Sequence, residues 1–120
     1  MAVYPPHPAW DALLGLFQRL WRDAGLDLFI GRRLPELLRA AGLVDVQAEL
    51  RTRLDRLGEY RRTNLLALTE STREKLVERD LVSADRLADL MDALAQHLAD
   101  PHIVVARELL FQVRGRKPTD

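Results

Sequence analysis

The sequence contains no cysteine, which excludes disulfide bonds and thiolate metal sites and suits a reducing compartment. No apolar run approaches the roughly 20 residues that a membrane-spanning helix needs. The first residues lack the basic and apolar regions of a secretory signal, so we expect a cytoplasmic protein. Eighteen Lys and Arg residues balance eighteen Asp and Glu residues, and general nucleic-acid binding needs a surplus of positive charge. We therefore expect neither a membrane nor a nucleic acid as partner.

Histidine and glycine are also scarce, and their positions exclude further classes of site. His7, His97 and His102 are too dispersed to converge on a metal ion, so we predict no metal site. The six glycines are isolated, and none belongs to the Gly-x-Gly-x-x-Gly loop that binds dinucleotide cofactors. No nucleophile has a neighbouring base, and the sequence places no two carboxylates at a shared site. Catalytic residues therefore stay unassigned.

What the sequence does contain is typical of one globular domain over residues 1–120. Hydrophobic residues make up 48% of the chain and charged residues 30%. The patterns predict an irregular arm over residues 1–7, an aromatic amphipathic helix over 8–24, and a helix–glycine–strand unit over 32–55. A helical insertion over 59–99, a last strand over 103–114 and a polar tail over 115–120 follow. The fold class is α+β, with about four helices and a two-stranded antiparallel β pair.

The first helix has the strongest periodicity. Its apolar residues recur at helical spacing and form one face: Trp10, Leu13, Leu14, Phe17, Leu20, Trp21 and Ala24. Pro8 suits the first turn, and Gly25 is placed to end the helix. A face with three aromatic side chains favours a core position. The alternative is a surface that contacts a partner.

The unit over residues 32–55 changes period at a glycine. Helical spacing places Leu34, Leu37, Leu38 and Ala41 on one face, and Gly42 follows as the stop. From Val44 to Leu54, apolar and polar residues alternate, which is typical of a half-buried strand. Arg32 and Arg33, like Arg61 and Arg62 further on, are paired cations of the kind that usually lie in solvent.

The helical insertion contains two helices. The first has a mixed face of Leu65, Leu68, Thr72, Leu76 and Val77. Ser83 is a good N-cap for the second, which Asp100-Pro101 ends. The β-branched run from Ile103 then begins the last strand. We expect this strand to pair antiparallel with the strand over 44–54, some fifty residues away.

Two segments resemble class I S-adenosylmethionine-dependent methyltransferases. "GRRLPELLRAAGLVDVQAEL" (31–50) is similar to the last helix and following strand of that family, and "VVARELLFQVRGRKP" (104–118) to its closing strand. The resemblance implies the C-terminal portion of a Rossmann-like fold, with a transferase activity that is incomplete in this chain alone. S-adenosylmethionine is the cofactor that the family implies. The chain lacks the family's glycine-rich loop and its strand-end acid, so we expect no binding of that cofactor by the chain alone.

The resemblance also implies an acceptor side. The segment before residue 31 resembles the family's substrate-side helical region, and the substrate-facing candidates are Tyr4, His7, Trp10, Phe17, Trp21, Tyr60 and Asn64. For Tyr4 and His7 the alternative is a mobile N-terminus. The partners it implies are a small-molecule acceptor and a complementary methyltransferase chain. Two other functions remain open: a stand-alone helical interaction module that uses the aromatic face, and a small apolar-ligand-binding domain.

The last strand predicts association. Its edge is apolar, with Ile103, Val105, Leu109, Phe111 and Val113, and no proline interrupts it before Pro118. A two-stranded sheet is marginal alone, and an open edge recruits another strand. We expect a homodimer, unless a complementary chain supplies the missing strand.

Overall fold

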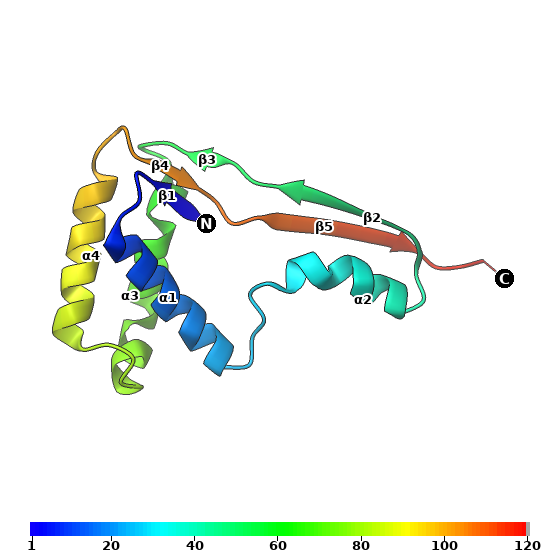
Figure 1. The fold of residues 1–120 in the computed structure, drawn as a ribbon, viewed down its shortest axis with the longest axis horizontal. Coiled ribbons are helices and arrows are strands. Elements are labelled where there is room, and N and C mark those ends of the chain that lie inside the picture. Colours follow the sequence, from blue (N-terminus) through cyan, green and yellow to red (C-terminus); the bar gives the residue numbers. More distant parts are fainter. Residues whose placement is uncertain (120) are drawn as a thin grey trace.

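The computed structural model describes residues 1–119 and shows an α+β fold with two small antiparallel sheets (Figure 1). Within this range there are four α-helices: α1 (Pro8–Asp23), α2 (Leu34–Ala40), α3 (Asn64–Glu78) and α4 (Ala84–Leu98). Two 3-10 helices precede α2 and α3: η1 (Ile30–Arg33) and η2 (Tyr60–Thr63). The strands are β1 (Ala2–Tyr4), β2 (Val44–Arg51), β3 (Leu54–Asp55), β4 (Val104–Ala106) and β5 (Leu110–Arg116).

One end of the molecule, which we call the head, holds the hydrophobic core. Here α1, α3 and α4 pack beside the sheet of order β1-β4-β3 (Figure 1). Leu13, Leu65, Leu87 and Leu94 are among its most deeply buried side chains. The predicted caps are present: Ser83 accepts a hydrogen bond from the Arg86 amide at the start of α4. The predicted N-cap of α4 is therefore confirmed, whereas α3 buries Thr69, which the predicted face did not include.

The other end, which we call the arm, is a two-stranded ribbon with one helix. β2 and β5 pair antiparallel, with Ala48 opposite Val113 and Leu50 opposite Phe111. This confirms the predicted pairing between distant strands. Figure 1 shows α2 on one side of the ribbon, and the helix contacts both strands. Gly42 ends the α2 segment with φ +90°, as its place after the apolar face predicts.

The arm extends away from the head and has little core of its own. The molecule measures 61 × 35 × 19 Å, with a radius of gyration of 17.9 Å. A compact chain of this length has a radius of about 14 Å. No residue of η1, α2, β2 or β5 is buried. The arm therefore lacks the apolar burial that stabilises an independent sheet.

The two faces of the ribbon differ. A Cβ at Gly31 would lie 2.9 Å from Phe111 Cδ2, and one at Gly115 would lie 2.9 Å from Leu43 Cβ, so Phe111 and Gly115 face α2 and the segments flanking it. The opposite face is polar, with Gln47 opposite Arg114 and Glu49 opposite Gln112. Arg114 donates from Nε and Nη2 to Gln47 Oε1, at 3.1 and 2.6 Å. The uncovered face is thus suited to water rather than to a partner.

Several predicted boundaries are wrong. The arm predicted as irregular over residues 1–7 contains β1, because Val3 pairs with Val105 and buries its side chain in the head. Each long strand is broken where it passes from one sheet to the other, between Arg51 and Leu54 and between Ala106 and Leu110. The tail predicted over 115–120 begins later, because β5 continues to Arg116. Asp120 lies outside the described residues.

Arg62 departs most from expectation. The sequence predicts a solvated cation, but the side chain is 2% exposed and lies beneath the end of α4. Its guanidinium donates to the backbone carbonyls of Leu98, Asp100 and Ile103, including an Nη2–O distance of 2.7 Å to Asp100. The Leu98 carbonyl is among those that the end of α4 leaves without a helical partner, and the other two lie in the segment between α4 and β4. Arg62 therefore caps α4 from a neighbouring segment.

Candidate functional site

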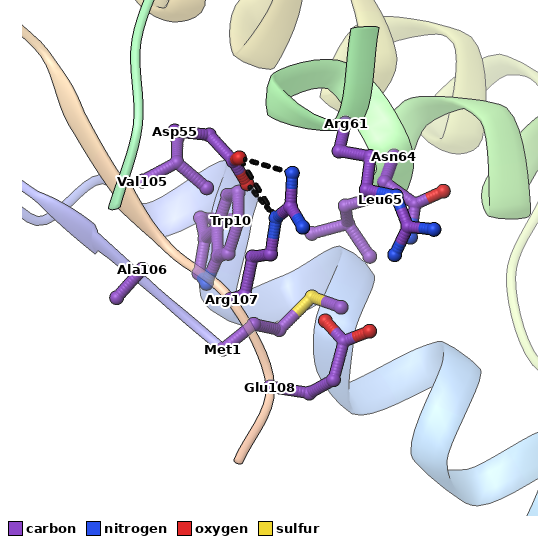
Figure 2. Close-up of a pocket in the computed structure, with 10 residues that line it drawn as sticks. All are labelled: Met1, Trp10, Asp55, Arg61, Asn64, Leu65, Val105, Ala106, Arg107 and Glu108. Atoms are coloured by element: carbon purple, nitrogen blue, oxygen red, sulfur yellow. Dashed lines mark hydrogen bonds and ion pairs between the residues drawn. The ribbon is translucent and has the colours of Figure 1, made fainter. Parts of the chain in front are cut away.

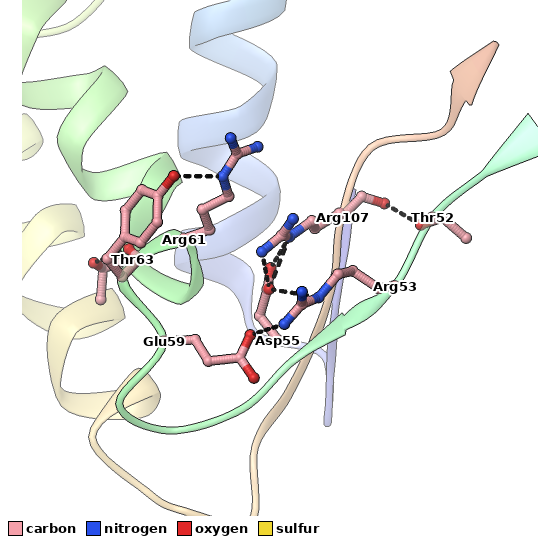
Figure 3. A network of polar contacts seen from close by, with 8 residues as sticks. Thr52, Arg53, Asp55, Glu59, Arg61, Thr63 and Arg107 are labelled. Atoms are coloured by element: carbon pink, nitrogen blue, oxygen red, sulfur yellow. Dashed lines mark hydrogen bonds and ion pairs between the residues drawn. The ribbon is translucent and has the colours of Figure 1, made fainter. Parts of the chain in front are cut away.

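A polar cluster lies at the neck, where the strands pass from the head into the arm (Figure 3). Asp55 on β3 is 1% exposed, and Arg107 follows β4. Arg107 Nε donates to both carboxylate oxygens of Asp55, at 2.7 and 2.8 Å, and Nη2 lies 2.7 Å from Oδ1. Arg53 Nε lies 3.7 Å from Asp55 Oδ1, and the Arg53 guanidinium also pairs with the Glu59 carboxylate. The cluster joins both strands to the segment that leads into α3.

This pairing sets the protonation of Asp55. The hydrogen bond from Arg107 is the largest cause that lowers the pKa of the carboxyl, and burial opposes it. The same hydrogen bond raises the pKa of Arg107. A carboxylate whose pKa is lowered and whose oxygens are both occupied makes a poor general base. The neck is therefore a structural clamp rather than a catalytic acid–base pair.

The cavity beside the clamp is too small for a substrate (Figure 2). Trp10, Asn64, Asp55 and Arg107 line it, but its volume is about 10 Å³. A cavity needs roughly 10–15 Å³ to hold one water molecule. Among the seven substrate-facing candidates, Trp10 and Asn64 are the two that meet here, in a space that holds one water at most.

His7 has a structural contact. Its Nδ1 accepts a hydrogen bond of 3.0 Å from the Ala9 amide, so His7 is the N-cap of α1. Its ring lies 4.6 Å from that of His97, centroid to centroid. His97 Nε2 lies 3.0 Å from the Pro5 carbonyl oxygen. The two histidines therefore hold the N-terminal segment against the end of α4.

The remaining candidates are spread over the head. Phe17 and Trp21 are half-buried on α1 and meet edge to face, with ring centroids 5.6 Å apart. Trp10 is 2% exposed, so the core position predicted for the aromatic face is confirmed there. Tyr4 and Tyr60 are exposed, and Arg61 Nε donates to the Tyr60 hydroxyl at 2.8 Å. Tyr4, Phe17, Trp21 and Tyr60 do not line the cavity that contains Trp10 and Asn64.

A larger hollow lies between the head and the arm. Its volume is about 310 Å³, within the range of ligand pockets, and its lining is mostly apolar. The lining residues are Met1, Leu28, Phe29, Gly31, Arg32, Glu108, Leu109 and Phe111.

Local interactions fix one wall of this hollow. Asp27 accepts a hydrogen bond from the Phe29 amide at 2.9 Å and pairs with Arg33 at 3.2 Å. The Arg32 guanidinium lies 5.0 Å above the Phe29 ring, within the range of a cation–π contact. A cation and the carboxylate of Glu108 therefore flank an apolar floor.

Sequence reasoning missed this hollow. The available signal is the apolar run Leu26–Ile30, which belongs to neither a long helix nor a strand and ends at Gly31. Leu26, Leu28, Phe29 and Ile30 are each exposed by 41–52%. Exposed apolar side chains grouped in this way make the segment a candidate binding surface.

The hollow adjoins an open sheet edge. β1 occupies the outer edge of β4, and within residues 1–119 the outer edge of β5 has no partner strand. Met1 and Phe111 line the hollow at the point where the occupied edge gives way to the open one. The apolar hollow and the unpaired edge of β5 thus form one continuous surface. We call the unpaired edge of β5 the open edge.

The described residues do not form a cradle for S-adenosylmethionine. Gly25, Gly42 and Gly58 have positive φ, but each stands alone, and of the three only Gly58 follows a strand and precedes a helix. The family's loop needs several glycines so that backbone amides can approach the ligand. Over residues 1–119, no cluster of three His, Cys, Asp or Glu side chains is placed to hold a metal ion. No helix in the same range is long and apolar enough to cross a membrane.

Comparison with known proteins adds no family. No protein-family model matches the chain, and no curated protein matches it significantly.

Proposed function

We propose that this chain is the substrate-side, C-terminal portion of an S-adenosylmethionine-dependent methyltransferase, catalytically incomplete alone. The observation that carries the proposal is the open edge of β5 on an arm without buried residues. Such an arm gains stability when another strand joins it. A complementary chain with the donor-binding half would supply that strand, and a cytoplasmic location belongs to the same proposal.

The order of elements in the arm supports this reading. α2, Gly42 and β2 follow one another as the helix, glycine and strand of the resemblance do, and β5 pairs antiparallel with β2. In the family, the last two strands are antiparallel and helices cover the sheet. The antiparallel pairing of β2 with β5 and the position of α2 on one side of the ribbon support the proposal (Figure 1).

The hollow supports an acceptor role. It is apolar, with Arg32 and Glu108 at its border, which suits a small apolar acceptor carrying one polar group. Class I methyl transfer relies largely on positioning, and a base is needed only for poor nucleophiles. The residues of the hollow would hold the acceptor, and the complementary chain would hold the methyl donor.

Co-expression tests the proposal. The tagged chain is produced with the glycine-rich, donor-binding half of a class I methyltransferase, truncated before its last helix. We expect the two to co-purify, and we expect Leu110→Pro, at the start of β5, to abolish the complex because proline removes a backbone donor. The control is Leu54→Pro in β3, which lies away from the open edge. Equal loss with both variants, or no complex with the unmodified chain, would contradict the proposal.

A second candidate is a small apolar-ligand-binding domain that works alone, and the hollow favours it as well. Fluorescence titration with 1-anilinonaphthalene-8-sulfonate separates the two. Saturable binding by the chain alone, weakened by Phe29→Ala and unchanged by Tyr60→Ala, would support this candidate. Phe29 lines the hollow, whereas Tyr60 is exposed elsewhere.

A further inference from the structure

The open edge has a definite length. β5 offers seven residues, Leu110–Arg116, before Pro118 removes a backbone donor. At its other end the edge is closed by β1, whose Ala2 lies opposite Ala106. A strand that joins β5 must therefore fit between β1 and the end of β5.

We propose that the occupant is β5 of a second copy of this chain, antiparallel and centred on Val113. In this register Leu110 lies opposite Arg116 of the second copy, so the two strands match over their whole length. Pro118 of the second copy then reaches the level of Glu108, just short of β1. A register centred on Gln112 would carry Pro118 to the level of Ala106, where Ala2 already pairs.

The side chains also favour the register centred on Val113. On the face toward α2, Phe111 lies opposite Gly115 of the second copy, and a large aromatic side chain beside a glycine on a neighbouring strand is a known stabilising pair. On the polar face, Arg114 lies opposite Gln112 of the second copy. A register centred on Arg114 would place two arginines directly opposite each other, which is destabilising.

The position of α2 agrees with the same arrangement. α2 contacts both strands of its ribbon, so its axis lies near the midline between them. Two ribbons joined through β5 have midlines two strand spacings apart, which is about 10 Å. Packed helices have axes about 8–10 Å apart. A two-fold axis through Val113 thus brings the two α2 helices to packing distance, and Leu37, 38% exposed in one copy, is available to cover the contact.

This dimer goes beyond the proposed function, because it concerns the chain alone. It uses the edge that a complementary chain would occupy, so the two assemblies exclude each other. The chain without a complementary partner is a two-fold dimer with one four-stranded sheet, β2-β5-β5-β2.

A charge pair at position 112 tests the interface. Within one chain, Gln112 lies opposite Glu49, and across the interface it lies opposite Arg114 of the second copy. The pair with Glu49 is present in monomer and dimer alike, so only the contact with Arg114 of the second copy shifts the association. Gln112→Lys therefore opposes the dimer, whereas Gln112→Glu favours it. We expect the dissociation constant to rise by roughly 2- to 30-fold in Gln112→Lys and to fall in Gln112→Glu, at low salt.

Sedimentation equilibrium at micromolar concentration measures these shifts. The unmodified chain should have twice the monomer mass of 13.7 kDa. A mass of 13.7 kDa at every concentration would overturn the proposal. A dimer in which the two variants shift in the same direction would overturn the interface.

A cysteine scan tests the register. The chain has no cysteine, so Val113→Cys, Gln112→Cys and Arg114→Cys each introduce a single one. Only position 113 meets its own copy, so oxidation should cross-link Val113→Cys fastest. Faster cross-linking at position 112 or 114 would overturn the register. If Val113→Cys fails to fold by circular dichroism, the two charge variants still decide the interface.

Discussion

Replacing Arg62 should destabilise the head far more than replacing its neighbour Arg61. Arg62 is 2% exposed and donates to the carbonyls of Leu98, Asp100 and Ile103, whereas Arg61 is exposed. Arg62→Met keeps most of the apolar volume but removes the guanidinium donor from all three carbonyls, of which Asp100 keeps the Ile103 amide as a second donor. Unsatisfied buried polar groups cost about 1–3 kcal/mol each, so the free energy of unfolding should fall by about 3–5 kcal/mol.

Urea unfolding followed by far-UV circular dichroism measures this loss, at one protein concentration because association changes apparent stability. Arg61→Met removes the same charge from an exposed position and should change the free energy of unfolding by less than about 0.5 kcal/mol. Arg62→Lys should fall between the two, because one ammonium cannot span three carbonyls. If the free energy of unfolding of Arg62→Met lay within about 1 kcal/mol of that of the unmodified chain, the reasoning would be refuted. The predicted loss is a large share of the roughly 5–15 kcal/mol that stabilises a small domain.

Four further outcomes are expected. Gly15→Ala should raise the melting temperature, since Gly15 lies within α1 with open space around its Cα, and alanine gains about 0.5–1 kcal/mol in a helix. Gly115→Ala should lower it, since the new Cβ would lie 2.9 Å from Leu43 Cβ. Trp10→Ala should cost about 3–5 kcal/mol in urea unfolding, because Trp10 belongs to the core. Folding lowers the pKa of Asp55 from its ordinary value of 3.8. The ionised carboxylate therefore stabilises the fold fully above pH 3.8, and this stabilisation is lost as the pH falls through the lower pKa of the folded state. Urea midpoints of Asp55→Asn and the unmodified chain should therefore differ at pH 7 and converge in strong acid.

The elements with strong local patterns were predictable from the sequence. The apolar face of α1, with Pro8 before it and Gly25 after it, specifies the helix almost to the residue. Gly42 marks the change from helix to strand correctly. The alternation from Val44 to Leu54 predicts a strand there, and the antiparallel pairing of β2 with β5 was expected from the strand order that the family resemblance implies.

Features that depend on tertiary contacts were not predictable. β1 has three residues, and its pairing with β4 depends on the burial of Val3, which no local pattern shows. Within residues 1–119, Arg62 forms no ion pair, and its acceptors are backbone carbonyls that no sequence pattern marks. The hollow brings Phe29 together with Leu109 and Phe111, some eighty residues away, so periodicity within one segment could not reveal it.

The proposal that this chain supplies only the substrate side of a methyltransferase is tested most directly by calorimetric titration with S-adenosylmethionine. Two samples are compared: the chain alone, and the chain co-purified with a donor-binding half. The proposed function predicts no binding by the chain alone, which has no glycine-rich cradle, and binding at micromolar strength by the complex. Micromolar binding by the chain alone, or no binding by the complex, would contradict it.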